Sequence, residues 1–188
     1  MEPQPIEKYF ISPQELLLDS FRLAKQIYNS EYRPTFLLAL WRGGTPTGIA
    51  VQEFLSYKGV KTDHIPPRTS LYRGINEANQ EVRVHGIDYV VNNANYNDSL
   101  LIIDDVFETG KSIQAVVERL QSKMRKNLPR EIKVGTVYYK PERNQTPIIP
   151  DFYIHQTDRW LVFPHELEGL SLEEICEGKG IEIAELAT

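Results

Sequence analysis

Short apolar runs alternate with amphipathic stretches along this sequence. Three runs, at residues 35–40, 100–103 and 134–139, are mostly apolar, which is typical of strands buried on both faces of a sheet. Because such strands alternate with helices, the pattern predicts an α/β fold with a central, mostly parallel sheet flanked by helices. Apolar residues at helical spacing mark the helices: Leu17, Phe21, Ala24 and Tyr28, then residues 49–55, then Ile113, Val117, Leu120 and Met124.

Two long segments interrupt this alternation. Residues 68–97 are polar and lack a helical period, so we expect a mobile excursion, with a hairpin as one form of it, of the kind that often acts as a lid. After Pro150 the pattern is again irregular. Serine and glutamate at the spacing of a capping box, within residues 12–15 and 171–174, predict the start of the first helix and of a last short helix.

Length and composition limit the class of protein. The 188 residues predict a single domain spanning 1–188, and a content of 41% hydrophobic and 25% charged residues is ordinary for a globular protein. Cys176 is the only cysteine, which excludes an intrachain disulfide and a cysteine-based zinc site. Residues 1–10 do not resemble a secretory signal, and no apolar run approaches the ~20 residues of a membrane span, so we expect a cytoplasmic protein with no membrane partner. The net charge of −5 argues against a nucleic-acid partner but allows a local pocket for a small anion.

The strongest chemical signal follows the predicted strand at 100–103. Asp104 and Asp105 come next, and paired acids can accept hydrogen bonds from vicinal hydroxyls and recruit Mg²⁺. Because burying two unpaired carboxylates is costly, we expect at least one of them to be exposed. Residues 109–112 (Thr-Gly-Lys-Ser) then offer hydroxyls, a lysine and backbone N–H groups at a helix N-terminus, which together form a phosphate cradle. Acids for a ribose beside donors for its phosphate predict a ribose 5-phosphate pocket.

Other readings of this segment fit less well. A Walker A loop needs a glycine five residues before Gly110, where this sequence has Asp105, so that motif is excluded. A response-regulator receiver domain also has a strand that ends in two acids, but it needs them near its first strand and leaves residues 109–111 without a role. An acidic strand end followed by an ordinary capped helix provides no packing reason for the hydroxyl–glycine–lysine–hydroxyl cluster.

A second glycine loop follows the predicted strand at 35–40. Arg42, Gly43 and Gly44 form this loop. Glycine lets backbone N–H groups approach an anion closely, and the arginine can pair with it. Because ligands of open parallel sheets bind beyond the carboxyl ends of the strands, we expect both glycine loops at the same ligand-binding edge.

Together these segments resemble the type I phosphoribosyltransferases. Residues 101–110 are similar to the family's signature for 5-phosphoribosyl 1-diphosphate (PRPP), which is a hydrophobic strand, two acids, two apolar residues and then Asp-Thr-Gly. This sequence departs from the signature at Glu108, where the family usually has Asp. Residues 40–44 resemble the family's diphosphate loop.

Two further segments resemble the purine-specific members of the family. Lys140, in Val-Tyr-Tyr-Lys-Pro, looks like the strand-end lysine that donates to the 6-oxygen of the purine. Residues 158–166 resemble the hood of the xanthine-guanine and hypoxanthine enzymes. In that hood Trp160 would stack on the base, and the backbone of Leu161 would read its edge. Glu166 would approach the 2-substituent of the base or the metal.

The resemblance implies transfer of the 5-phosphoribosyl group from Mg-PRPP to a 6-oxopurine (hypoxanthine, guanine or xanthine) in purine salvage, with release of diphosphate. It also implies a hood formed mainly by residues 141–188 and a homo-oligomer, either a dimer or a tetramer. PRPP would be held by Arg42, Gly43, Gly44, Asp104, Asp105, Thr109, Gly110, Lys111 and Ser112, with Asp105 nearest the Mg²⁺. The base would be held by Glu108, Lys140, Trp160, Leu161 and Glu166, and the catalytic residues would be Glu108, Asp104 and Asp105.

The resemblance also suggests residues for the mobile loop that closes over the reaction. Residues 69–72 (Thr-Ser-Leu-Tyr) could supply its serine and tyrosine. Arg73 or Arg83 could reach the diphosphate from this loop, and the sequence does not choose between them.

Two other functions stay open at this point. Glu108 in place of Asp suits a regulatory protein that senses PRPP without transferring it, although Lys140 and Trp160 argue for a retained base site. His165 beside Glu166 suits a phosphoribosyltransferase that acts on a base other than a purine.

Overall fold

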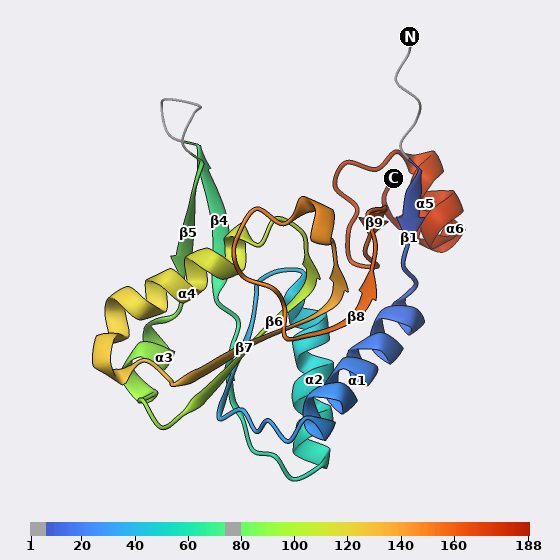
Figure 1. Cartoon of the computed structure of the whole chain (residues 1–188). Helices are drawn as coiled ribbons and strands as arrows, with labels where there is room; N and C mark the ends of the chain where they lie inside the picture. The colour runs from blue at the N-terminus through green and yellow to red at the C-terminus, as the bar shows by residue number, and fades with distance from the viewer. Residues whose placement is uncertain (1–6, 74–79) are drawn as a thin grey trace.

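Parallel strands form the centre of the molecule, with helices on both faces (Figure 1). The computed structural model describes residues 7–73 and 80–188, without the side chains of residues 71–73, 80 and 81. Within these ranges five strands form one sheet in the order β3-β2-β6-β7-β8, and each neighbouring pair is parallel. The predicted α/β fold class is confirmed. The strands are β2 (Phe36–Ala39), β3 (Asp63–Ile65), β6 (Ser99–Phe107), β7 (Glu131–Tyr139) and β8 (Phe152–Gln156).

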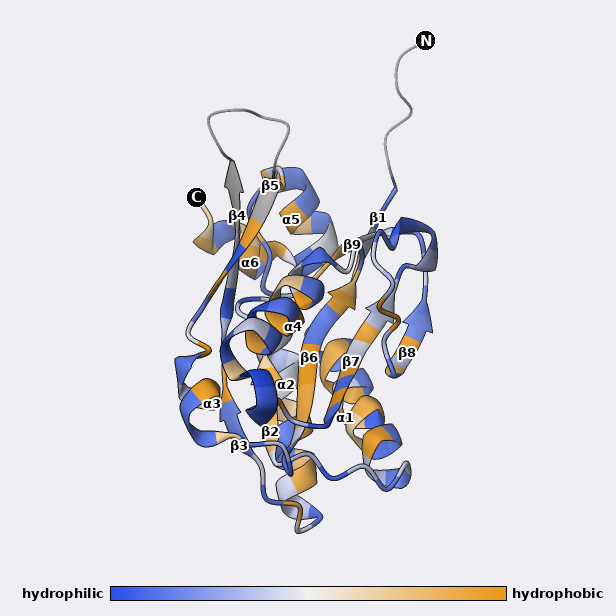
Figure 2. Cartoon of the chain, turned by 60° about the vertical axis from the view of Figure 1, so that its left-hand side comes forward, coloured by the Kyte–Doolittle hydropathy of each residue, from blue (hydrophilic) through white to orange (hydrophobic). Residues whose placement is uncertain are grey.

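Helices pack on both faces of this sheet. Leu37 and Leu101 face the side covered by α1 and α2, while Leu38 and Ile102 face the side covered by α3 and α4. Because successive strand residues point to opposite faces, a strand covered on both sides is apolar at most positions, as β6 is over most of its length in Figure 2. The helices are α1 (Pro13–Asn29), α2 (Gly44–Tyr57), α3 (Asp88–Asn93) and α4 (Lys111–Met124), and short 3₁₀ turns follow at Arg125–Asn127 and Pro141–Arg143.

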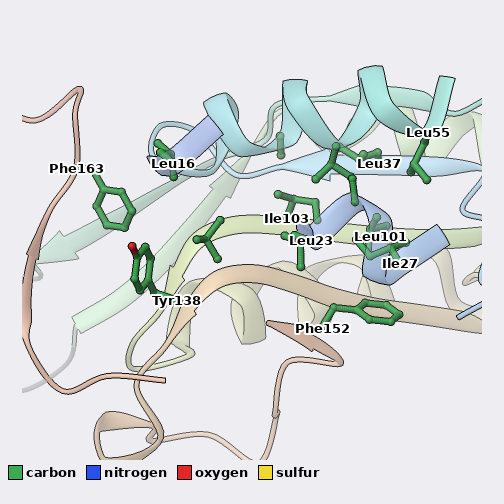
Figure 3. Close-up of a cluster of buried hydrophobic side chains, with 14 of the residues drawn as sticks. Leu16, Leu23, Ile27, Leu37, Leu55, Leu101, Ile103, Tyr138, Phe152 and Phe163 are labelled. Carbon is green, nitrogen blue, oxygen red and sulfur yellow. The ribbon is translucent and has the colours of Figure 1, made fainter. Parts of the chain in front are cut away.

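The side of α1 that faces the sheet differs from the predicted one. Leu16, Leu23 and Ile27 are buried against the sheet (Figure 3), whereas Leu17 and Phe21 are 45% and 37% exposed. Only part of the predicted stripe is therefore correct. The leucines at the start of this helix are consecutive, so two neighbouring stripes look almost equally apolar in the sequence.

The polar segment 68–97 contains regular structure. β4 (Arg68–Arg73) and β5 (Gln80–His85) form an antiparallel hairpin, as one form of the predicted excursion requires. Residues 74–79 lie outside the described part of the chain. The helix α3 that follows was not predicted; it is short, and it is held by Val90, which is fully buried.

The predicted hood combines distant parts of the chain. β1 (Lys8–Phe10) pairs in parallel with β9 (Trp160–Val162), and α5 (Leu172–Lys179) and α6 (Ile181–Leu186) lie beside this pair (Figure 1). The Nζ of Lys8 is 2.5 Å from Oε1 of Glu174 on α5. β8, within the segment 141–188, is the edge strand of the central sheet. Across the described residues, no helix is long and apolar enough to cross a membrane.

Candidate active site

The two acids of the predicted PRPP signature lie at the carboxyl end of β6, in the middle of the sheet. Asp104 is half-buried and Asp105 is only 6% exposed, so the prediction that at least one acid is exposed is wrong. The reason is the loop of Gly43 and Gly44, which packs against both carboxylates. A Cβ at Gly43 would overlap the carboxylate of Asp105, and a Cβ at Gly44 would lie 2.9 Å from Oδ1 of Asp104. Both positions therefore require glycine.

Burial changes the proton affinity of both acids. Burial, followed by repulsion from Asp105, raises the pKa of Asp104 well above its usual value, although the N–H groups of Asp105 and Gly44 donate to it. Burial also raises the pKa of Asp105 to about 6, against the hydrogen bond from the Val106 N–H at 2.7 Å. The nearby charge of Glu166 adds to that rise. A cation or a set of hydroxyl donors placed here would stabilise the ionised pair.

The first glycine loop joins β2 to α2 directly beside β6. The N–H of Leu40 donates to the carbonyl of Ile103 at 2.9 Å, which ties the start of the loop to the central strand. The peptide bond between Trp41 and Arg42 is cis. Arg42 is exposed, and its Nη2 lies 3.6 Å from Oε2 of Glu168 in the hood. Arg42 thus lies between the acid pair and the hood, where an anion can reach it.

The second glycine loop forms the N-terminus of α4. Gly110 has a φ of 75°, in the left-handed region, and a Cβ there would lie 2.5 Å from Oγ1 of Thr146 and 2.7 Å from the ring of Phe107. The first N–H groups of an α-helix have no partner within the helix, so those of this turn can bind an anion. The predicted phosphate ligands that gather here are Thr109, Gly110, Lys111 and Ser112.

A pocket of about 370 Å³ lies between the strand ends and the hood. Lys140 is only 4% exposed, and its Nζ lies 3.3 Å from Oε2 of Glu108. The other oxygen of Glu108 is 2.8 Å from Nη1 of Arg143. Trp160 borders the pocket and is 46% exposed, so its ring is open to a ligand. The lining includes all the residues predicted to hold a base: Glu108, Lys140, Trp160, Leu161 and Glu166.

Two residues at this site, Arg143 and Lys8, were not predicted, and His165 was considered only for a base other than a purine. Arg143 pairs with Glu108, and its place one 3₁₀ turn after Lys140 is a signal that the sequence contains. Lys8 lines the pocket from β1, far away in the sequence, so no local pattern indicates it. His165 has its Nε2 3.7 Å from Oδ2 of Asp105, and burial lowers the pKa of its imidazole.

The structure describes the side chains of only some of the hairpin residues that were considered for loop closure. Arg83 and Lys111 line opposite walls of a groove of about 730 Å³ between β5 and α4. Ser70 on β4 has its Oγ 3.4 Å from Nε2 of His85. The side chains of residues 71–73, including the arginine proposed as the alternative to Arg83, lie outside the described residues.

Solved phosphoribosyltransferases share the fold that carries this site. Comparisons of the sequence with family models and with curated proteins find no match. The purine phosphoribosyltransferase of Pyrococcus horikoshii matches over 87% of this chain and 97% of its own, with 25% identity and a TM-score of 0.68. The xanthine-guanine-hypoxanthine phosphoribosyltransferase of Helicobacter pylori matches over 86% and 96%, with 20% identity and a TM-score of 0.65. The chain has the fold of the type I phosphoribosyltransferases.

Another neighbour matches this chain along nearly its whole length. It is a hypothetical protein from Neisseria gonorrhoeae, solved with bound ppGpp, and the match covers 99% of this chain and 100% of that one. The identity is 18% and the TM-score is 0.75. The shared fold therefore includes the hood as well as the central sheet.

Removing the charge of Asp105 should stabilise the folded protein at neutral pH. The folded protein holds a proton on Asp105 up to about pH 6, whereas an unfolded Asp releases it near 4. The folded state thus binds more protons in this window, and stability falls as the pH rises through it. We expect Asp105→Asn to gain on the order of several degrees in Tm relative to the unchanged protein at pH 7.5, and much less at pH 4.

Asp158 provides the control, because Asp158→Asn makes the same substitution at an exposed position. Thermal unfolding of the three proteins at the two pH values measures the effect. An Asp105→Asn variant that is less stable than the unchanged protein at pH 7.5 would contradict the buried, uncompensated state of this acid.

Proposed function

We propose that this chain transfers the 5-phosphoribosyl group from PRPP to a 6-oxopurine, releasing diphosphate and a nucleoside monophosphate. The observation that supports this most strongly is the shared pocket of Lys140, Glu108 and Trp160, beside the acid pair and the phosphate turn. A donor for an oxo group, an acid and an open aromatic face are the parts needed to hold a purine. The same proposal includes a role in purine salvage in the cytoplasm and self-association into a homo-oligomer.

Recognition of the base would begin with Lys140. Its ammonium group can donate hydrogen bonds but cannot accept them, so it suits the 6-oxygen of hypoxanthine, guanine or xanthine rather than the amino group of adenine. Because Lys140 is buried, a base that offers no acceptor to its ammonium group would bind more weakly, which increases the preference for 6-oxopurines over adenine. Trp160 would stack on the base, and Leu161 would offer its backbone to the edge of the ring. Glu166 has one oxygen engaged by the Phe163 N–H at 2.9 Å, which leaves its other oxygen for the ligand.

The ribose and its phosphate would lie across the ends of β2 and β6. Asp104 and Asp105 would accept hydrogen bonds from the ribose hydroxyls, and the turn at 109–112 would hold the 5-phosphate. Arg42, Gly43 and Gly44 would hold the diphosphate through a guanidinium group and backbone donors.

The acid pair also suits a divalent cation. Burial raises the pKa of both carboxyl groups, so a nearby cation would stabilise their ionised forms. Carboxylate oxygens are also the ligands that Mg²⁺ prefers. Across the described residues, no group of three or more His, Cys, Asp or Glu side chains could hold a metal ion. Mg²⁺ would therefore bind together with the diphosphate, with Asp105 as its main protein ligand, and would neutralise the charge of the leaving group.

The transfer itself would require little covalent work from the protein. The bond between the ribose C1 and the base nitrogen forms as the bond to diphosphate breaks, and positioning and electrostatics provide most of the acceleration. Glu108 would take the imidazole proton of the base as that bond forms. Lys140 and Arg143 each contact one oxygen of the Glu108 carboxylate. These two ion pairs would hold the Glu108 side chain, which is longer than the usual Asp, in one orientation.

A second candidate function is a nucleotide sensor without transfer activity. The neighbour solved with ppGpp matches this chain from end to end, and a guanine nucleotide could use both the base pocket and the phosphate turn. Glu108 in place of Asp agrees with this function as well. Transfer to a base other than a purine stays as a third outcome.

The deciding experiment is an incubation of the purified protein with Mg-PRPP and a panel of bases, with release of diphosphate as the readout. Release with hypoxanthine, guanine or xanthine supports the proposal, and release only with adenine or a pyrimidine contradicts it. Stabilisation by ppGpp in thermal unfolding, with no diphosphate released with any base, would favour the sensor.

Filling the phosphate turn should abolish binding of PRPP. In Gly110→Ala the new Cβ meets Thr146 and Phe107 and disturbs the backbone donors. PRPP should raise the Tm of the unchanged protein, because a ligand that binds only the folded state stabilises it, and this rise should disappear in the variant.

Gly59 provides a matched control for this variant. It also has a positive φ, of 80°, but a Cβ added there would meet no atom within 4 Å. Gly59→Ala should therefore lose a similar amount of backbone stability and keep the full shift with PRPP. An equal shift in both variants would place the phosphate elsewhere.

The choice of base should depend on Lys140. Lys140→Met keeps the length of the side chain and removes the donor, so we expect the preference for 6-oxopurines over adenine in kcat/KM to fall by on the order of 100-fold. Exposed Lys126→Met is the control and should leave the preference unchanged. A preference that survives Lys140→Met would show that another group reads the base.

Shortening Glu108 should lower turnover. In Glu108→Asp the carboxylate retreats by about 1 Å from its position between Lys140 and Arg143, and an error of that size can cost on the order of 100-fold. Steady-state kinetics should show a lower kcat with an unchanged affinity for PRPP, while exposed Glu142→Asp should change neither. A rise in kcat would instead indicate a decayed catalytic site, in agreement with a sensor.

A further inference from the structure

His165 faces the acid pair from the hood and has no role in the transfer described above. Its Nε2 lies 3.7 Å from Oδ2 of Asp105, and its side chain is 27% exposed. This distance is too long for a direct hydrogen bond. A single oxygen atom can nevertheless lie at hydrogen-bond distance, roughly 2.8 Å, from both atoms at once. The pair is thus spaced to bind a small polar group between them.

A stack of rings holds the imidazole in this position. The ring of His165 stacks on Phe163 at 5.8 Å with an angle of 21°, and Phe163 meets the edge of Tyr138 at 5.9 Å. Tyr138 stacks on His155 at 5.1 Å, and Nε2 of His155 is 2.7 Å from Oδ2 of the buried Asp19. Figure 3 shows the rings of Tyr138, near the end of β7, and Phe163 next to each other. Because the stack reaches the domain core, little side-chain entropy is left for a ligand to remove.

We propose that His165 recognises a ribose hydroxyl of the substrate together with Asp105, and so selects ribosyl over deoxyribosyl compounds. The hydroxyl would donate to the Asp105 carboxylate and accept from Nε2–H of His165. A carboxylate opposite Nε2 favours the tautomer with the proton on that nitrogen. This inference rests on the proposed function, because it uses the ribose placed on the acid pair.

The chemistry of the pair favours a hydroxyl over the other groups of PRPP. A phosphate oxygen beside Asp105 would be repelled by its carboxylate, and a base edge belongs in the pocket of Lys140. A hydroxyl is both donor and acceptor, so it satisfies an acid on one side and an N–H on the other. His165 is therefore a specificity residue at the ribose, whereas Glu108 acts at the base.

Two variants separate this hydrogen bond from the ring stack. His165→Phe keeps a ring against Phe163 but has no donor, and His165→Gln keeps a donor but has no ring. The ligands are the nucleoside monophosphate formed in the assay of the proposed function and its 2′-deoxy and 3′-deoxy analogues. Each is titrated by calorimetry at a high and at a low concentration of Mg²⁺. Exposed His64→Phe is the matched control.

In the unchanged protein we expect one deoxy analogue to bind about 3- to 10-fold more weakly than the ribonucleotide. His165→Phe should weaken the ribonucleotide by that factor and leave the analogue unchanged, so that the preference disappears. His165→Gln should keep part of the preference, and His64→Phe all of it. Tm values near that of the unchanged protein show that the variants fold.

Three results would overturn the assignment. The first is a full preference for the ribonucleotide in His165→Phe. The second is a loss that grows as Mg²⁺ is lowered and is equal for ribo and deoxy ligands, which would make His165 a metal ligand. The third is an equal loss of all ligands in both variants, which would make its role structural. These results differ from failure of the proposed function, in which the unchanged protein would release no diphosphate from PRPP.

Discussion

The close approach of the Gly43–Gly44 backbone to the buried acids Asp104 and Asp105 is the constraint on which the rest of the site depends. The acids end the central strand of the sheet, and only a loop without side chains can pass over them. That passage removes water from the carboxylates, and this burial raises their pKa values. The diphosphate loop and the ribose acids are therefore one unit, in which neither part can change residue type independently of the other.

Much of this arrangement was predictable because the relevant signals are local. The buried strands appear as apolar runs, and Ser12 and Ser171 form the capping boxes that the sequence indicates, with Glu15 and Glu174 as their partners. The turn at 109–112 leads into a helix, α4, as the sequence predicts. The residues predicted to hold a base gather in one pocket, because β6, β7 and the hood present them at the same end of the sheet.

The remaining features depend on contacts between distant segments. Asp105 is buried and Asp104 is half-buried because a loop some sixty positions earlier in the chain packs on top of them. No local pattern in the sequence reveals a contact between segments so far apart. Lys8 is at the site because β1 pairs with β9 in the hood, and no pattern around this residue indicates that. His165 lies in the segment that resembles the hood, but its approach to Asp105 depends on how the hood folds against the sheet. The buried side of α1 cannot be read from the sequence, because the leucines at its start are consecutive. Only packing against the sheet determines that Leu16, Leu23 and Ile27 are the buried residues.

The pairing of β1 with β9 has a consequence for how the molecule assembles. Lys8 and Glu174, which meet in the hood, are 166 positions apart in the chain. Closing so long a loop carries an entropic cost that local helix and strand contacts do not have, so the pairing is favourable only once the central sheet has brought the two segments together. Trp160 is the partner of Lys8 in this pairing, and its position is therefore set late in folding. During synthesis on the ribosome, the phosphate turn can form while the wall that would receive a base still lacks its second strand.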